Sequence, residues 1–279
     1  MDAPQGLPRY RERIIAACAS APSIGGIEYG NKVLALDEDT VVKVGTGVTQ
    51  EEARNQLFAY ETFYGSFHIP EVLDFFEHSS SGIRIGYLVM ERVRGKSLAE
   101  ISMQDSGESM LDQVVLAIVR MRKETFTRPG PIGGGRGSGF PWGDETLESF
   151  HLDVTAGEIV ISHGDLQRRN MIRRPDGSLC IVDWATAGAY PSYREIAAIM
   201  YGRDSDPEYF DGLLTKLKAK MAIGEEEHAK QLLQVQYASL RVCSTAAIRS
   251  SSKVFECSFC WRCCMRMTPS STTSYTHLL

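Results

Sequence analysis

Two acids and an amide in the middle of the chain have the types and spacing of a metal and proton-transfer site. Asn170 comes five residues after Asp165, and Asp183 follows the apolar run 179–182. Mg²⁺ takes a few protein oxygens and completes its coordination with water and phosphates. The first acid suits acceptance of a proton from a hydroxyl nucleophile. Each residue alone would more often cap a turn, but together they indicate an oxygen-ligand site beside a base.

A lysine in the first third of the chain has an unusual setting. Lys43 lies in the run Val41-Val42-Lys43-Val44, so the apolar side chains fall on both faces of an expected strand. A buried ammonium is costly unless a carboxylate or a phosphate compensates it. We therefore expect Lys43 to have such a partner, the alternative being an edge-strand lysine that reaches solvent.

The segment around the first acid resembles the catalytic loop of kinases. Residues 163–166 read His-Gly-Asp-Leu, and Asn170 follows after three more residues. This wording is similar to that of the aminoglycoside phosphotransferase and choline kinase-like family, and residues 168–172 resemble its fungal branch. The resemblance covers about residues 30–245. It implies that Asp165 is the catalytic base and that Asn170 and Asp183 bind the metal.

The same resemblance implies further roles. It gives Lys43 the nucleotide phosphates and a glutamate on the next helix, for which we choose Glu52, with Glu51 as the alternative. Residues 87–95 resemble the hinge between two lobes, where backbone groups at about Glu91 and Val93 would pair with the adenine. His163 is expected in the catalytic group, where it orders the loop by hydrogen bonding or acts directly.

The expected fold is α+β and protein-kinase-like, with a small antiparallel-sheet N-lobe and a mostly helical C-lobe. We assign 1–93 to the N-lobe, with its nucleotide-binding sheet and helix. Residues 94–249 form the C-lobe with the catalytic loop, the metal site and the acceptor pocket, and 250–279 form an atypical tail. Periodicity and turn residues predict the following elements: strands at 32–36, 40–44, 69–76 and 83–93, and helices at 50–63 (capped by Thr49), 110–123, 194–202 and 206–243.

Composition narrows the function classes. A net charge of −5 disfavours nucleic-acid binding, and no apolar run reaches the roughly 20 residues of a membrane span. Three of the seven cysteines are scattered, which predicts no disulfide framework and a cytoplasmic protein. The other four crowd 257–264, too tightly for the usual paired spacing of zinc ligands. A tail altered by a splice or frame error is the interpretation that we prefer to a zinc cluster.

The resemblance implies an enzyme that uses ATP and Mg²⁺ to phosphorylate a hydroxyl of a small molecule of the aminoglycoside or choline class. Asp183 is followed by Trp184-Ala185 rather than Phe-Gly, and no Ala-Pro-Glu segment follows. Both differences disfavour a protein kinase. The alternative hypothesis is a nucleotide-binding or inactive kinase-like module with a degraded acceptor site. The sequence leaves the oligomeric state open.

Overall fold

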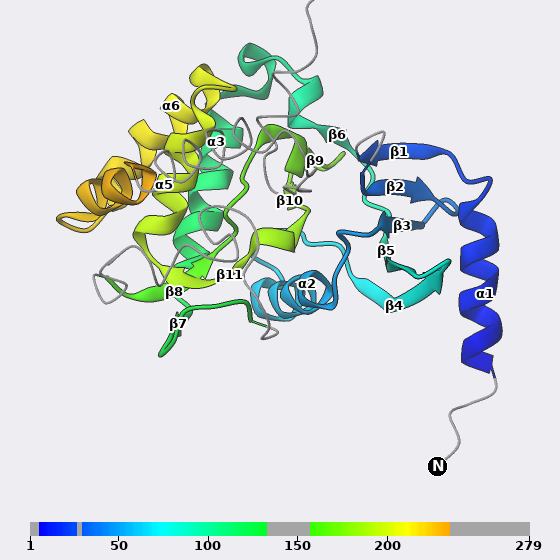
Figure 1. Cartoon of the computed structure of the whole chain (residues 1–279). Coiled ribbons are helices and arrows are strands. Elements are labelled where there is room, and N and C mark those ends of the chain that lie inside the picture. Colours follow the sequence, from blue (N-terminus) through cyan, green and yellow to red (C-terminus); the bar gives the residue numbers. More distant parts are fainter. Residues whose placement is uncertain (1–5, 27–29, 133–156, 235–279) are drawn as a thin grey trace, which may run out of the picture. The chain divides into compact units, whose positions relative to one another are not determined.

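The structure, a computed structural model, describes residues 6–26, 30–132 and 157–234. The N-terminal part is an antiparallel sheet of five strands in the order β1-β2-β3-β5-β4 (Figure 1). The strands of this sheet are β1 (Ser23–Gly26), β2 (Lys32–Ala35), β3 (Thr40–Gly45), β4 (Val72–Ser80) and β5 (Ile83–Glu91).

Helices dominate the rest of the described chain. The α-helices are α1 (Gly6–Cys18), α2 (Gln50–Phe63), α3 (Met103–Met121), α5 (Tyr193–Gly202) and α6 (Pro207–Leu217), with a further helical stretch at 225–234. Short 3₁₀ helices are η1 (Leu98–Glu100), η2 (Arg168–Asn170), η3 (Trp184–Thr186) and η4 (Lys218–Lys220).

The alternation of side chains along β3 divides the sheet into two faces. Val42 belongs to one face, where it packs in a cluster with Ile14 of α1. Val41 belongs to the other face and clusters with Ala53 of α2. Lys43 is two residues from Val41 and therefore points to the same face, toward α2.

Two small antiparallel sheets follow the five-stranded sheet, and one of them positions the predicted metal ligands Asn170 and Asp183. One has the order β10-β9-β6 and the other the order β11-β8-β7. In the first sheet the register pairs Ile181 with Met171. Asn170 directly precedes β9 and Asp183 follows β10, so this hairpin brings the two residues to the same end. The strands are β6 (Lys96–Ser97), β7 (Thr125–Phe126), β8 (Ile159–Ser162), β9 (Met171–Arg173), β10 (Leu179–Ile181) and β11 (Gly188–Pro191).

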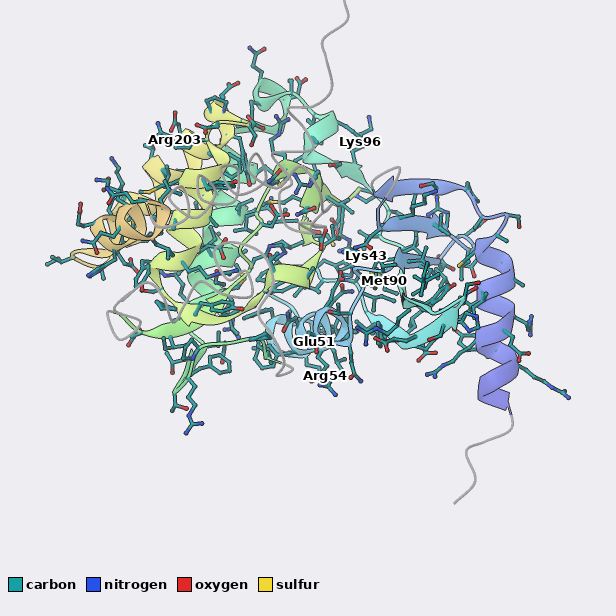
Figure 2. The ribbon with its side chains drawn as sticks, in the orientation of Figure 1. Lys43, Glu51, Arg54, Met90, Lys96 and Arg203 are labelled. Carbon is teal, nitrogen blue, oxygen red and sulfur yellow. The ribbon has the colours of Figure 1, made fainter. Side chains whose placement is uncertain are left out.

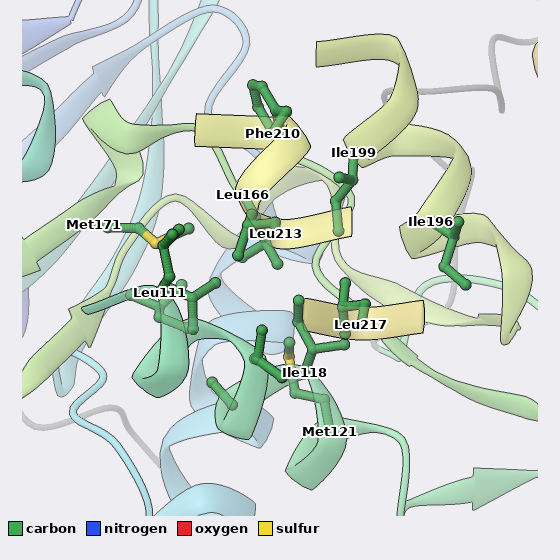
Figure 3. Packing of buried hydrophobic residues seen from close by; sticks show 14 of the residues in the cluster. Leu111, Ile118, Met121, Leu166, Met171, Ile196, Ile199, Phe210, Leu213 and Leu217 are labelled. Carbon is green, nitrogen blue, oxygen red and sulfur yellow. The ribbon is translucent and has the colours of Figure 1, made fainter. Parts of the chain in front are cut away.

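The largest hydrophobic core lies among α3, α5, α6 and the strands that precede and follow the loop at 163–170. Figure 3 shows side chains of α3 facing those of α6, with side chains of α5 beside α6 and Leu166 and Met171 packed next to them. Leu166 and Met171 are 2% and 0% exposed. The loop that carries Asp165 is thus anchored in this core at both ends.

Helix α2 belongs to two cores. Its N-terminal half places Ala53 against the five-stranded sheet. Its C-terminal half places Ala59 and Phe63 in the large core together with Trp184, whose ring lies 6.4 Å from that of Phe63. The helix therefore fixes the sheet-rich part and the helical part to each other.

Most predicted elements are present, and two helix predictions were wrong in extent. The predicted helix at 50–63 is confirmed, and Thr49 caps it by accepting the backbone N–H of Glu52 at 3.3 Å. The helix predicted at 110–123 begins at Met103, because Ser102 caps it through the N–H of Asp105. The helix predicted at 206–243 stops at Leu217, and a new one starts only after Gly224, whose φ of +85° requires a glycine-like conformation.

Residues 235–279, with the predicted tail and its cysteine cluster, lie outside the described residues. Among the described helices, none combines the length and the apolar character needed to span a bilayer.

Candidate active site

The ammonium of Lys43 lies between two carboxylates. Its Nζ is 2.6 Å from Oε1 of Glu52 and 2.8 Å from Oδ1 of Asp183. Strand β3 supplies the lysine, the first turn of α2 supplies the glutamate, and the end of the β9–β10 hairpin supplies the aspartate. The pairing of Lys43 with Glu52, rather than with Glu51, is confirmed. In Figure 2 Lys43 lies above α2, whereas Arg54 lies below it.

Burial and mutual attraction set the charges of this group. Burial lowers the pKa of Lys43, but Glu52 and Asp183 outweigh it and raise that pKa above its ordinary value. Burial also raises the pKa of Glu52 to about 7, against the attraction of the Lys43 ammonium. Oε2 of Glu52 is buried without a hydrogen-bond partner among the described residues, which is the physical source of that penalty. Burial raises the pKa of Asp183, yet the lysine reverses the effect and holds that pKa below its usual range.

Asp165 lies in the second group of polar residues, just before η2. Its Oδ2 accepts a hydrogen bond from Nδ2 of Asn170 at 2.9 Å and one from Arg169 at 2.9 Å. Asn170 also donates to the backbone carbonyl of Asp165 at 2.9 Å. Burial raises the pKa of Asp165, and the guanidinium of Arg169 opposes the rise. The negative charge of Asp183 contributes to the raised pKa of Asp165, so the two predicted acids lie near each other.

His163 holds the backbone on both sides of this region. Its Nε2 donates to the carbonyl of Val182 at 3.1 Å, and its Nδ1 accepts the N–H of Asp165 at 3.3 Å. Burial lowers the pKa of His163, which favours the neutral ring that one donating and one accepting nitrogen require. The ring also lies edge-on to Trp184, with centroids 4.8 Å apart. The geometry of His163 is that of a residue that joins the two loops.

Asp183 adopts a backbone conformation that is uncommon for a residue other than glycine. Its φ and ψ are 64° and 69°, in the left-handed region. Such a residue carries a strain of about 1–3 kcal/mol and persists only where its surroundings hold it. The following helix η3 is held on one side by Thr186, whose hydroxyl donates to the carbonyl of His163 at 2.7 Å.

A buried glutamate of α5, which the sequence did not reveal, anchors the predicted catalytic loop. Glu195 is 2% exposed and accepts hydrogen bonds from three consecutive residues. The hydroxyl of Ser162 donates at 2.8 Å, the N–H of His163 at 2.6 Å and the N–H of Gly164 at 3.1 Å. The one local signal was a pair of charged residues in the first turn of an otherwise apolar helix.

The neighbouring Arg194 completes this anchor. It is fully buried, donates to the Ser162 hydroxyl and to the carbonyl of Thr186 at 3.0 Å each, and stacks 4.1 Å from the centre of the Tyr190 ring. Gly164 has a φ of +77°, and a Cβ there would lie 2.5 Å from the guanidinium. A glycine is therefore required where the loop passes over Arg194.

The predicted hinge residues lie apart from these groups, at the end of β5. The N–H of Glu91 donates to the carbonyl of Glu71 at 2.9 Å, and the Glu91 carboxylate accepts from His68 at 2.9 Å. No backbone hydrogen bond of Val93 is found within the described part of the chain. The side chain of Glu91 is thus engaged within the fold, while the backbone of Val93 has hydrogen-bonding capacity to offer.

The donor set around Asp183 fits a hard divalent cation. The N–H of Val182 donates to the carbonyl of Asn170 at 3.0 Å, which keeps the Asn170 and Asp183 segments adjacent. Asn170 directs its amide nitrogen to Asp165, so its amide oxygen is the atom that can bind a metal. Asn170 and Asp183 would thus supply two protein oxygens. Mg²⁺ suits such a site, because it completes its six ligands with water and phosphate oxygens. In the described ranges, no group of three or more His, Cys, Asp or Glu side chains forms a ready-made metal cluster.

Comparison with known proteins gives a fold. No family model and no curated protein matches the sequence. Solved structures do match, among them a GDP and kanamycin complex of APH(2'')-IIIa, with a TM-score of 0.51, 13% identity and coverage of 87% of this chain and 95% of that one. A thermostable mutant of aminoglycoside phosphotransferase APH(4)-Ia matches with a TM-score of 0.50, 16% identity and coverage of 84% and 98%. The chain has the aminoglycoside phosphotransferase fold.

This result confirms the predicted protein-kinase-like fold, while the assignment to the fungal branch stays a prediction. Within the aminoglycoside phosphotransferase fold, the structure brings together Lys43, Glu52 and Asp183 by direct contact. It brings Asn170 to Asp165 in the same way. Glu91 and Val93 are joined to neither group by a contact between described residues.

Proposed function

We propose that this chain is a small-molecule kinase that uses ATP and Mg²⁺ to phosphorylate a hydroxyl group. The observation that carries the proposal is the position of the Lys43 ammonium, 2.6 Å from Glu52 and 2.8 Å from Asp183. Phosphate transfer depends mainly on positioning and charge neutralisation, for which a buried cation beside a metal-binding acid is suited. The fold, which is that of known phosphotransferases, supports the same conclusion.

On the nucleotide side, Lys43 binds the phosphates while Glu52 keeps its ammonium in place. The contact of Lys43 with Asp183 yields in part to the phosphates when the nucleotide enters. Asn170 and Asp183 would hold Mg²⁺, which neutralises the charge on the phosphate oxygens. The backbone carbonyl of Glu91 and the N–H of Val93 receive the adenine.

On the acceptor side, Asp165 takes the hydroxyl proton. Both of its side-chain hydrogen bonds end on Oδ2, so Oδ1 is the atom that faces the acceptor without a hydrogen bond from the described residues. A raised pKa makes this carboxylate a better proton acceptor near neutral pH. The acceptor oxygen forms its bond to the γ-phosphorus, the bond from that phosphorus to the ADP oxygen breaks, and the proton passes to Asp165. His163 orients the loop that carries this carboxylate.

The class of the acceptor follows from the similarity alone. The APH(2'')-IIIa structure contains GDP and kanamycin, so both ATP and GTP deserve testing as donors. Amino sugars, choline-like alcohols and simple sugars are the acceptors to compare. A small-molecule hydroxyl compound is the partner that we propose, and cytoplasmic location stays a prediction.

The proposal is tested by turnover of the whole chain with each donor and acceptor, and by the variant Asp165→Asn. We expect this variant to lose about 10²–10⁴-fold in phosphate transfer, because the proton acceptor is gone, while nucleotide binding persists. The control is Asp112→Asn, which removes a carboxylate that is 56% exposed and pairs with Lys216. Full turnover in Asp165→Asn would exclude the assigned base. Nucleotide binding without turnover on any acceptor would favour the inactive kinase-like module.

A further inference from the structure

A buried amide on α2 bridges three segments of the chain. Asn55 is 1% exposed and lies one helical turn after Glu52. Its Nδ2 donates to the carbonyl of Ala187 at 2.7 Å and to that of Trp184 at 3.2 Å. Its Oδ1 accepts the N–H of Ile132 at 3.2 Å. Two donors and one acceptor are all used, which only an asparagine can supply in this space.

The two carbonyls belong to the segment that immediately follows Asp183. Trp184 opens η3 and Ala187 closes it. Thr186 holds the opposite side of this segment. Its hydroxyl donates to the carbonyl of His163, and its own carbonyl accepts a hydrogen bond from Arg194. Asn55 therefore ties the backbone of this segment to α2 by hydrogen bonds, beside the packing of Trp184 against Phe63.

We infer that Asn55 is a positioning residue for the metal site, an inference that rests on the proposed function. Helix α2 contributes the partner of Lys43 through Glu52 and, three residues later, the clamp on the Asp183 segment. One rigid helical turn thus sets the distance between the phosphate-binding cation and the metal-binding acid. Asp183 has a strained left-handed backbone, and a clamp directly after it opposes relaxation of that backbone.

The inference predicts an effect on metal binding rather than on nucleotide binding in general. Loss of the clamp leaves the carbonyls of Trp184 and Ala187 without their donor and frees Asp183 to turn. Residues that orient metal ligands typically change metal affinity by 10–100-fold. We expect Asn55→Ala to raise the Mg²⁺ concentration needed for nucleotide binding by about tenfold or more. Nucleotide affinity in the absence of Mg²⁺ should stay that of the wild type.

Two variants and one control make the test specific. Asn55→Ala removes the whole amide, while Asn55→Asp keeps its shape and the acceptor for Ile132 but replaces the donor. Gln56→Ala is the matched control, since Gln56 is also 1% exposed, lies next on the same helix and donates to Pro70 at 2.9 Å and to the Met90 sulfur at 3.4 Å. Its contacts stay away from the Asp183 segment.

The first measurement is calorimetric binding of a non-hydrolysable ATP analogue to the full chain over a series of Mg²⁺ concentrations. The second is hydrogen exchange of residues 183–188 in the absence of ligand. In both Asn55 variants we expect nucleotide binding to need more Mg²⁺ and residues 183–188 to exchange faster. In Gln56→Ala we expect neither change. Equal Mg²⁺ dependence and equal exchange in Asn55→Asp and the wild type would overturn the inference.

The two proposals fail separately in this design. A wild-type chain that binds no nucleotide at any Mg²⁺ concentration contradicts the proposed function. In that case hydrogen exchange still decides whether Asn55 holds the Asp183 segment, since it needs no ligand. If the analogue binds and the Asn55 variants respond to Mg²⁺ as Gln56→Ala does, the function stands and the positioning role is refuted.

Discussion

The substitution Glu195→Gln tests how the catalytic loop is held. Glutamine keeps the size and shape of the side chain but offers one oxygen instead of two and adds an amide donor. The carboxylate accepts from the Ser162 hydroxyl, the His163 N–H and the Gly164 N–H, at 2.6–3.1 Å. All three bonds end on Oε2, so in the variant the same donors meet either a neutral amide oxygen or an N–H group at that position.

The magnitude follows from replacing a charged acceptor by a neutral one. A hydrogen bond to a charged group contributes about 1.5–3 kcal/mol and one between neutral groups about 0.5–1.5 kcal/mol. For the two backbone N–H groups together this difference predicts a loss of about 2–3 kcal/mol, against a total stability of about 5–15 kcal/mol for an ordinary domain. Because these donors belong to the residues directly before Asp165, turnover should fall at least about tenfold even where the variant stays folded, as misplaced catalytic groups do.

Urea unfolding and steady-state turnover measure the two effects. Glu61→Gln is the control, because Glu61 is an exposed residue of α2. An exposed change of this kind should stay within about 0.5 kcal/mol of the wild type. Wild-type stability and turnover in Glu195→Gln would refute the view that this carboxylate holds the loop.

Two further predictions concern pH and the tail. The folded pKa of Glu52, about 7, lies above its ordinary value of 4.5, so the folded state binds more protons between these values and stability falls as pH rises through that window. Relative to Glu52→Gln, the free energy of unfolding of the wild type should fall by up to about 3 kcal/mol from pH 4.5 to 7 in denaturant titrations. An identical pH dependence in the two proteins would contradict this. For residues 250–279 we predict no four-ligand zinc site and ready cleavage by proteases, because a sequence without helix or strand periodicity is expected to bury too little apolar surface to offset its conformational entropy. One tightly bound zinc per chain by elemental analysis, with a protease-resistant tail, would contradict this prediction.

The features that could be predicted from the sequence are those set by residues close together in the chain, such as the boundaries of α2. Thr49, the acids of the first turn and the apolar spacing after them were sufficient to delimit α2. The pairing of Lys43 with Glu52 was also within reach, since a buried ammonium must have a partner, the resemblance pointed to a glutamate on the next helix, and the first turn of that helix offers two. The start of α3 was missed because Ser and Gly are poor helix formers, and the capping hydroxyl of Ser102 decides the boundary.

Asn55 and Glu195 were out of reach of such reasoning. The neighbours of Asn55 in the sequence give no sign of what its amide binds, because its partner Trp184 is 129 residues away. Glu195 meets the catalytic loop across 31–33 residues. Both side chains are buried polar groups whose partners are mainly backbone atoms, and backbone atoms carry no sequence signature. Only the three-dimensional arrangement identifies them.

Because α2 packs in two hydrophobic cores, it cannot complete its contacts until late in the synthesis of the chain. The sheet and α2 are synthesised well before the segment that Asn55 and Phe63 contact. At about 5–20 residues per second, the 129 residues between Asn55 and Trp184 take roughly 6–26 s to appear. During that interval the apolar side of α2, with Ala59 and Phe63, has no large core to enter. The nascent chain therefore exposes an apolar helix face for many seconds, and we expect a fragment that ends near residue 93 to aggregate.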